Sequence, residues 1–104
     1  MILTTLEYIS GKEVLEHYGM VNGSTVRSKH LGKDIFAGLK NIIGGELKGY
    51  TELMEETRNE AVERLVQQAQ AKGANAILGI RFGTSDVAPG AAEVFAYGTA
   101  VKVG

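Results

Sequence analysis

The residues of this chain best suited to chemistry are its two histidines, His17 and His30. An imidazole with a carboxylate nearby is a common pair of ligands for a divalent metal ion. Glu13 lies four residues before His17, and Asp34 lies four residues after His30. A spacing of four brings side chains to one face of a helix but not of a strand, and we expect His17 in a strand. A surface or structural role is therefore favoured for both histidines over metal ligation.

Symmetry would change this balance. In a ring of identical subunits, one histidine per subunit becomes several imidazoles around the axis, and no local motif is then needed. His17 and His30 are kept as metal candidates on this ground, with a divalent metal as the candidate cofactor. The chain has no cysteine, which excludes disulfides, thiolate catalysis and cysteine-based zinc sites.

A glycine-rich segment and an arginine are candidates for contact with a ligand or a neighbouring subunit. The segment Gly44-Gly45-Glu46-Leu47-Lys48-Gly49-Tyr50 precedes the longest helical pattern and could offer backbone N–H groups to an anion. It lacks the Lys-Ser/Thr ending of a phosphate-binding loop, so a turn is the favoured interpretation. Arg58 interrupts the apolar stripe of the following helix, and a buried ion pair is favoured there over ligand binding.

No arrangement of residues in the sequence predicts catalysis. Serines occur at positions 10, 24, 28 and 85, without a Gly-x-Ser-x-Gly elbow or a recognisable set of His and Asp partners. Paired carboxylates occur only near the start of the long helix, where the helix dipole and solubility explain them. An enzyme with a site between subunits is therefore the least favoured functional hypothesis.

A helix over residues 51–72 is the clearest of the elements that must position these residues. No Gly or Pro interrupts it, Thr51 is the expected N-cap, and Gly73 supplies the left-handed residue that commonly ends a helix. Its apolar residues recur at spacings of three and four, at Met54, Ala61, Val62, Leu65 and Ala69. Such a stripe predicts a helix lying across a sheet.

Two long strands are expected after this helix, over residues 76–85 and 93–103, joined by a turn at Pro89-Gly90. The second strand is largely apolar on both faces. Alternation places on one face Val94, Ala96 and Ala100, and on the other Phe95, Tyr97, Thr99, Val101 and Val103. One helix covers only one face of a sheet, so the other face is expected to form an interface between subunits. The alternative is that the N-terminal half of the chain folds over that second face.

The N-terminal half predicts a strand over residues 2–5, a turn at 11–13, and a strand pair with a bend over 14–28, which contains Gly19 and Gly23. A short amphipathic helix is expected over 34–43, ending at Gly44-Gly45. We expect an α+β fold in a single domain over residues 1–104, since this length suits one core.

Charge and hydropathy exclude some classes of partner. The net charge is −1, with 11 basic and 12 acidic residues, and so gives no general attraction to nucleic acid or anionic lipid. No window approaches the ~20 apolar residues of a membrane span, and the start of the chain does not resemble a signal peptide. A cytoplasmic location is therefore expected, without nucleic acid or membrane partners.

Several short blocks in a fixed order resemble the YbjQ family of small bacterial proteins, which are often labelled heavy-metal-binding. The blocks are Val26-Arg27 with His30, Asp34-Ile35-Phe36-Ala37-Gly38-Leu39, Ile43-Gly44-Gly45-Glu46, Tyr50, Arg58-Asn59-Glu60-Ala61 and Gly73-Ala74-Asn75-Ala76-Ile77-Leu78-Gly79-Ile80.

This resemblance, which spans about 4–102, implies a dodecin-like subunit, an antiparallel sheet packed on one long helix, assembled as a homopentameric ring. Some relatives carry a cysteine near Tyr18-Gly19, where this chain has none. The resemblance marks Gly44, Gly45, Tyr50 and Arg58 as a pocket or interface group.

The leading hypothesis is a homo-oligomeric binding protein that holds a metal ion or a small molecule at subunit interfaces. The alternative is a structural or protein-interaction ring without a ligand. The sequence does not identify the metal, the small molecule or a partner protein.

Overall fold

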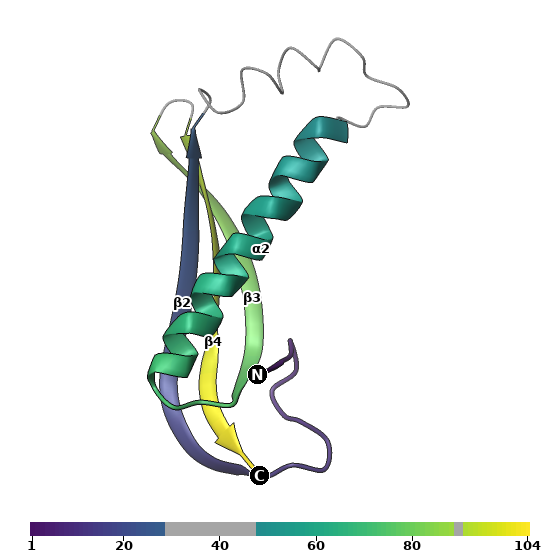
Figure 1. The fold of residues 1–104 in the computed structure, drawn as a ribbon, viewed down its shortest axis with the longest axis vertical. Coiled ribbons are helices and arrows are strands. Elements are labelled where there is room, and N and C mark those ends of the chain that lie inside the picture. The colour runs from purple at the N-terminus through teal and green to yellow at the C-terminus, as the bar shows by residue number, and fades with distance from the viewer. Residues whose placement is uncertain (29–47, 89–90) are drawn as a thin grey trace.

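A computed structural model describes residues 1–28, 48–88 and 91–104 of the chain. Its elements are β1 (Ile2–Leu3), β2 (Val14–Ser28), α2 (Lys48–Ala71), β3 (Ala76–Ala88) and β4 (Ala91–Val103). The four strands form one mixed sheet in the order β1-β3-β4-β2, in which only β1 and β3 run parallel. Helix α2 crosses one face of this sheet obliquely (Figure 1). The expected α+β class is confirmed, but the expectation of an antiparallel sheet is wrong for the whole sheet, because the short strand β1 pairs parallel to β3. The expected short helix over 34–43 lies outside the described residues.

The long helix begins earlier than expected and ends where expected. It starts at Lys48, so Thr51 lies inside it, and the prediction of Thr51 as N-cap is wrong. At the other end Gly73 has a φ of +88°, and the N–H of Ala74 donates to the carbonyl of Ala69 at 3.1 Å. This is the glycine stop that the sequence predicts.

The main core lies between α2 and the sheet. Ala61, Leu65 and Ala69 are fully buried at intervals of four residues, and they pack against side chains from three strands. The strand residues in this core are Val21, Ile77, Ile80, Val94, Ala96 and Ala100. Thr57 continues the buried line one turn earlier, with its hydroxyl donating to the carbonyl of Leu53 at 2.7 Å. This bond inside the helix makes a polar residue compatible with burial.

Strand β2 is one strand of 15 residues and not the expected strand pair. Its pairing with β4 shifts in register twice, between Val14 and Glu16 and between His17 and Gly19, and the second shift lies at the first glycine. Gly23 does not interrupt the strand. A Cβ added there would lie 2.3 Å from the carbonyl oxygen of Ala61 and 2.4 Å from the nitrogen of Leu65. Gly23 is therefore a point of close approach between β2 and the helix backbone.

The hairpin after the helix is longer than expected. β3 continues to Ala88 and β4 begins at Ala91, so residues expected in the connecting loop pair with one another as strands. The expected Pro89-Gly90 turn lies outside the described residues. In β4 the predicted alternation is confirmed, because Val94, Ala96 and Ala100 belong to the core under α2.

The second face of the sheet is covered in part by the N-terminal segment. Ile9 of this segment packs, together with Val14 at the start of β2, against a second buried cluster formed by Ala76, Leu78, Val101 and Val103. The backbone of the segment also bonds to β3, with the N–H of Gly79 donating to the carbonyl of Leu6 at 2.9 Å. The alternative in which the N-terminal half covers the second face is thus correct for the part of the sheet near β1.

Candidate functional site

Of the two histidines, the structure describes only His17, which is an exposed residue of the sheet. His17 is exposed in β2 and is paired in register with Val101. Glu13 precedes the strand, so the four-residue spacing does not bring the two side chains to one face. Within residues 1–28, 48–88 and 91–104, no three His, Cys, Asp or Glu side chains gather as metal ligands would. His30 and Asp34 lie outside the described residues.

The other sequence candidates are only partly described. Gly44 and Gly45 lie outside the described residues, and Tyr50 lies on the first turn of α2. Arg58 is exposed, so the expected burial of its ion pair is wrong for the single chain. The buried line of the helix passes through Thr57, and Arg58 follows it by about 100° around the helix axis. Because two of its four members lie outside the described residues, the group of Gly44, Gly45, Tyr50 and Arg58 stays a prediction.

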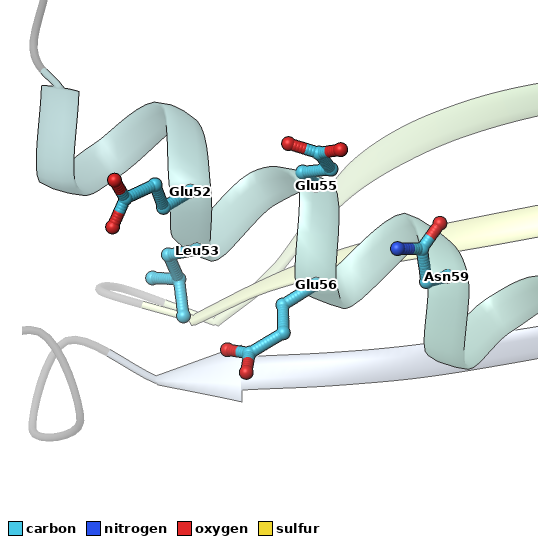
Figure 2. A pocket seen from close by; sticks show the side chains of 5 residues that line it. All are labelled: Glu52, Leu53, Glu55, Glu56 and Asn59. Carbon is cyan, nitrogen blue, oxygen red and sulfur yellow. The ribbon is translucent and has the colours of Figure 1, made fainter.

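A shallow hollow lies beside the N-terminal half of α2. Its described lining residues are Glu52, Leu53, Glu55, Glu56 and Asn59. The three glutamates are exposed, and Figure 2 shows the carboxylate of Glu55 pointing away from those of Glu52 and Glu56. Carboxylates that diverge in water do not form the closed set of oxygen ligands that a cation site requires. Solvation and helix electrostatics account for these residues.

The most unusual surface is the part of the second sheet face that the N-terminal segment leaves uncovered. We call it the open face and define it by Met20 and Val26 of β2 and Phe95 and Tyr97 of β4. Met20 is 77% exposed, Val26 53% and Tyr97 40%. Their strand neighbours Val21, Thr25 and Ala96 are buried on the α2 side, so these side chains point the other way.

The aromatic part of the open face is fitted to the strand beside it. Phe95 lies directly over Gly83 of β3, where an added Cβ would be 2.2 Å from Cζ of the ring. The ring of Tyr97 stacks near that of Phe95, with centroids 6.1 Å apart and planes at 28°. The face thus presents two packed aromatic rings, which suit an apolar contact with another surface.

Sequence reasoning missed a polar network on the opposite face, between β2 and α2. Glu60 pairs with Arg27 of β2 and with Arg64 one helical turn further on, the latter at 2.7 Å. Arg64 also donates a hydrogen bond to the carbonyl of Ser24. The signal available in the sequence was the spacing of four between Glu60 and Arg64. Nothing local indicated that Arg27 and Ser24 would be their partners.

Among the described residues, Tyr18 is the ionisable group whose pKa is clearly shifted by the fold. Loss of hydration raises the pKa of its phenol, and the hydrogen bond to the carboxylate of Glu16 at 3.1 Å and that negative charge act in the same direction. Its hydroxyl also lies 3.7 Å from the position of a Cβ at Gly73. Tyr18 therefore lies between the irregular part of β2 and the glycine that follows α2. Its raised pKa keeps the phenol protonated.

No helix in the described part of the chain is both long enough and apolar enough to cross a membrane.

Comparison with known proteins gives consistent matches over the whole chain. The family model YbjQ_1, described as "Putative heavy-metal-binding", matches residues 1–104. A UPF0145 protein of Hahella chejuensis is 62% identical over 101 residues, which are 97% of each chain. A UPF0145 protein of Vibrio parahaemolyticus is 55% identical over 103 residues, covering 99% of this chain and 98% of that one.

A crystal structure supports the fold. A protein of unknown function in the DUF74 family from Pediococcus pentosaceus superposes with a TM-score of 0.65 at 18% identity, covering 100% of this chain and 98% of that one. At this identity the likeness concerns the arrangement of the sheet and helix.

Proposed function

The chain belongs to the YbjQ family, and from this premise we propose that it is a homopentameric binding protein whose subunits meet through the open face. The ligand, a small molecule or a metal ion, is held at the boundary between subunits. The open face is the observation that carries the proposal.

Energetics favour covering this surface. Burying a large apolar side chain stabilises a complex by about 1.5–3 kcal/mol relative to leaving it in water. Met20, Val26 and Tyr97 are all exposed on the open face, and Leu6 and Tyr8 of the N-terminal segment are exposed as well. Single exposed apolar residues are ordinary, but a group of them on one sheet face is typical of an interface. Symmetry would repeat each contact around the ring.

The described residues of one subunit do not fit a soft metal. The chain has no cysteine, and the described residues offer no group of three ligands. Among the described residues His17 supplies one imidazole from each subunit, so a metal ion bound there through these residues would need ligands from several subunits at once. A small molecule held between apolar faces needs no such convergence.

Native mass spectrometry of the purified protein tests assembly and ligand binding together. We expect a pentamer carrying an additional mass in a fixed ratio to the subunit. Adding zinc or nickel ions to the metal-free pentamer distinguishes a metal ligand from a small molecule, because a bound metal ion adds its own mass. The variant His17→Ala tests whether that metal site uses His17, because the added mass would then be lost. A pentamer that stays free of any added mass after gentle purification would support the ligand-free structural ring instead.

A matched pair of variants tests the surface. Met20→Asp places a charge in the open face, and we expect it to shift the mass towards the single subunit. Gln67→Asp changes an exposed residue of α2, on the other side of the sheet, and is expected to leave the pentamer intact. Equal effects of the two variants would refute assembly through the open face.

A further inference from the structure

Strand β2 lies at the edge of the sheet and runs for 15 residues. A long edge strand presents unpaired N–H and C=O groups to which another strand can add. β3 has the opposite edge, and β1 is paired in register only with its residues Ala76 and Ile77. The edge strand β2 of one copy could pair with the part of β3 that β1 leaves unpaired in the next copy. Each copy added in this way would leave a new free edge. Such head-to-tail pairing can produce open filaments.

Two side chains of α2 occupy the middle of the β2 edge. The backbone N–H of Asn22 donates to Oε1 of Gln68 at 2.7 Å. Two residues further along the strand, the carbonyl of Ser24 accepts a hydrogen bond from Nη1 of Arg64. These backbone groups are satisfied by the helix, and both would have to be released before another strand could bond there.

The spacing of the two elements makes this arrangement regular. Residues four apart on a helix are separated by about 6 Å along its axis. Residues two apart on a strand are separated by about 6.7 Å. Gln68 and Arg64 therefore reach successive outward groups of β2, and the close approach at Gly23 keeps the helix near enough for both to do so.

The arginine is held in place by a further contact. Glu60 accepts a hydrogen bond from Arg64 at 2.7 Å, and its other oxygen pairs with Arg27. Arg27 is half-buried and anchors the carboxylate to β2 itself. The guanidinium of Arg64 is thereby oriented towards the strand before any partner approaches, which lowers the entropy cost of the contact.

We propose that Gln68 and Arg64 guard the edge of β2 against strand addition by a second copy of this chain. The guard directs copies to meet through the open face and not edge to edge. The inference rests on the proposed function for the choice of the alternative surface, and on the hydrogen bonds at Asn22 and Ser24 for the guard itself.

The test is the double variant Arg64→Ala/Gln68→Ala of the full chain. Alanine keeps the helix favourable, while both contacts with the edge are removed. The matched control is Glu63→Ala/Gln67→Ala, which alters two exposed residues of the same helix. A second variant, Arg64→Lys/Gln68→Glu, keeps a donor and an acceptor at the two positions.

Hydrogen exchange and sedimentation give separate readouts. We expect the backbone N–H of Asn22 to exchange at least about tenfold faster in dilute samples of the alanine variant, because its hydrogen bond to the side chain of Gln68 is lost. In concentrated samples we expect masses above that of the wild-type assembly, growing with concentration. The control and the Lys/Glu variant should keep the wild-type mass.

Two outcomes would overturn the guard. One is unchanged exchange at Asn22 in the alanine variant. The other is faster exchange without any new larger species at high concentration. A wild-type protein that remains a single subunit would overturn the proposed function alone, since growth of the alanine variant from single subunits would still reveal the guard.

Discussion

Replacing Gly23 by alanine tests how closely the helix and the sheet are joined. The added Cβ would lie 2.3 Å from the carbonyl oxygen of Ala61, 2.4 Å from the nitrogen of Leu65 and 2.9 Å from the carbonyl carbon of Arg64. All three are backbone atoms, so no side chain can turn aside to make room. Relief requires α2 and β2 to separate by about 1 Å, which strains a close-packed core.

The magnitude follows from two opposing terms. Overpacking a core typically costs about 1–3 kcal/mol, and a clash with three backbone atoms of α2 belongs at the upper end of that range. Alanine loses less chain entropy than glycine on folding, which returns about 0.5–1 kcal/mol. The net expectation for Gly23→Ala is a loss of about 2 kcal/mol in the free energy of unfolding. This is a large share of the about 5–15 kcal/mol typical of a domain.

Urea denaturation followed by far-ultraviolet circular dichroism measures this loss, at one fixed protein concentration because assembly contributes to stability. The control is Gly104→Ala, whose added Cβ meets the flexible end of Leu15 at 2.8 Å and is expected to change stability by less than about 0.5 kcal/mol. If Gly23→Ala were as stable as the wild type, the close approach of β2 to α2 would not exist. The argument that it positions Arg64 and Gln68 would fail with it.

Three further predictions concern the core, pH and the aromatic face. Leu65→Ala removes a fully buried side chain and should lower the free energy of unfolding by about 2–5 kcal/mol in urea; a loss below about 1 kcal/mol would contradict its burial. Because the fold raises the pKa of Tyr18, folding favours its protonated form, so its contribution to stability is full below about pH 10 and is lost as the pH rises through the folded-state value. The urea midpoint should therefore fall less steeply above about pH 10 in Tyr18→Phe than in the wild type, and equal slopes would refute this. Gly83→Ala must displace the ring of Phe95, so it should shift the native mass towards the single subunit while the far-ultraviolet signal of the helix changes little. An unchanged mass in native mass spectrometry would argue against a contact through that ring.

Local rules predicted the elements that depend on near neighbours in the chain. The stop at Gly73, the buried positions Ala61, Leu65 and Ala69, and the alternation in β4 all follow from residue type and periodicity. The start of α2 was misplaced because Thr51 has the chemistry of an N-cap while the helix continues through it. Capping preference indicates where a helix can begin and does not prevent an earlier start.

Features that depend on distant segments could not be predicted in this way. The role of Gly23 is visible only once α2 lies against it, and β2 was wrongly divided because a glycine in a strand indicates either a bend or a close approach. The cover formed by Ile9 of the N-terminal segment was an open alternative, since apolar residues in an irregular segment have no periodicity. For the candidate site, the sequence indicated an exposed apolar sheet face but not its limits, and the edge contacts of Arg64 and Gln68 left no local signal.

The mass of the wild-type assembly in solution tests the central claim most directly. Native mass spectrometry at micromolar concentration should give five copies of the 11.1 kDa subunit, a mass of about 56 kDa. Met20→Asp should convert that species to the single subunit without loss of the far-ultraviolet spectrum. A wild-type mass of 11.1 kDa at every concentration, with the open face exposed to water, would contradict the account.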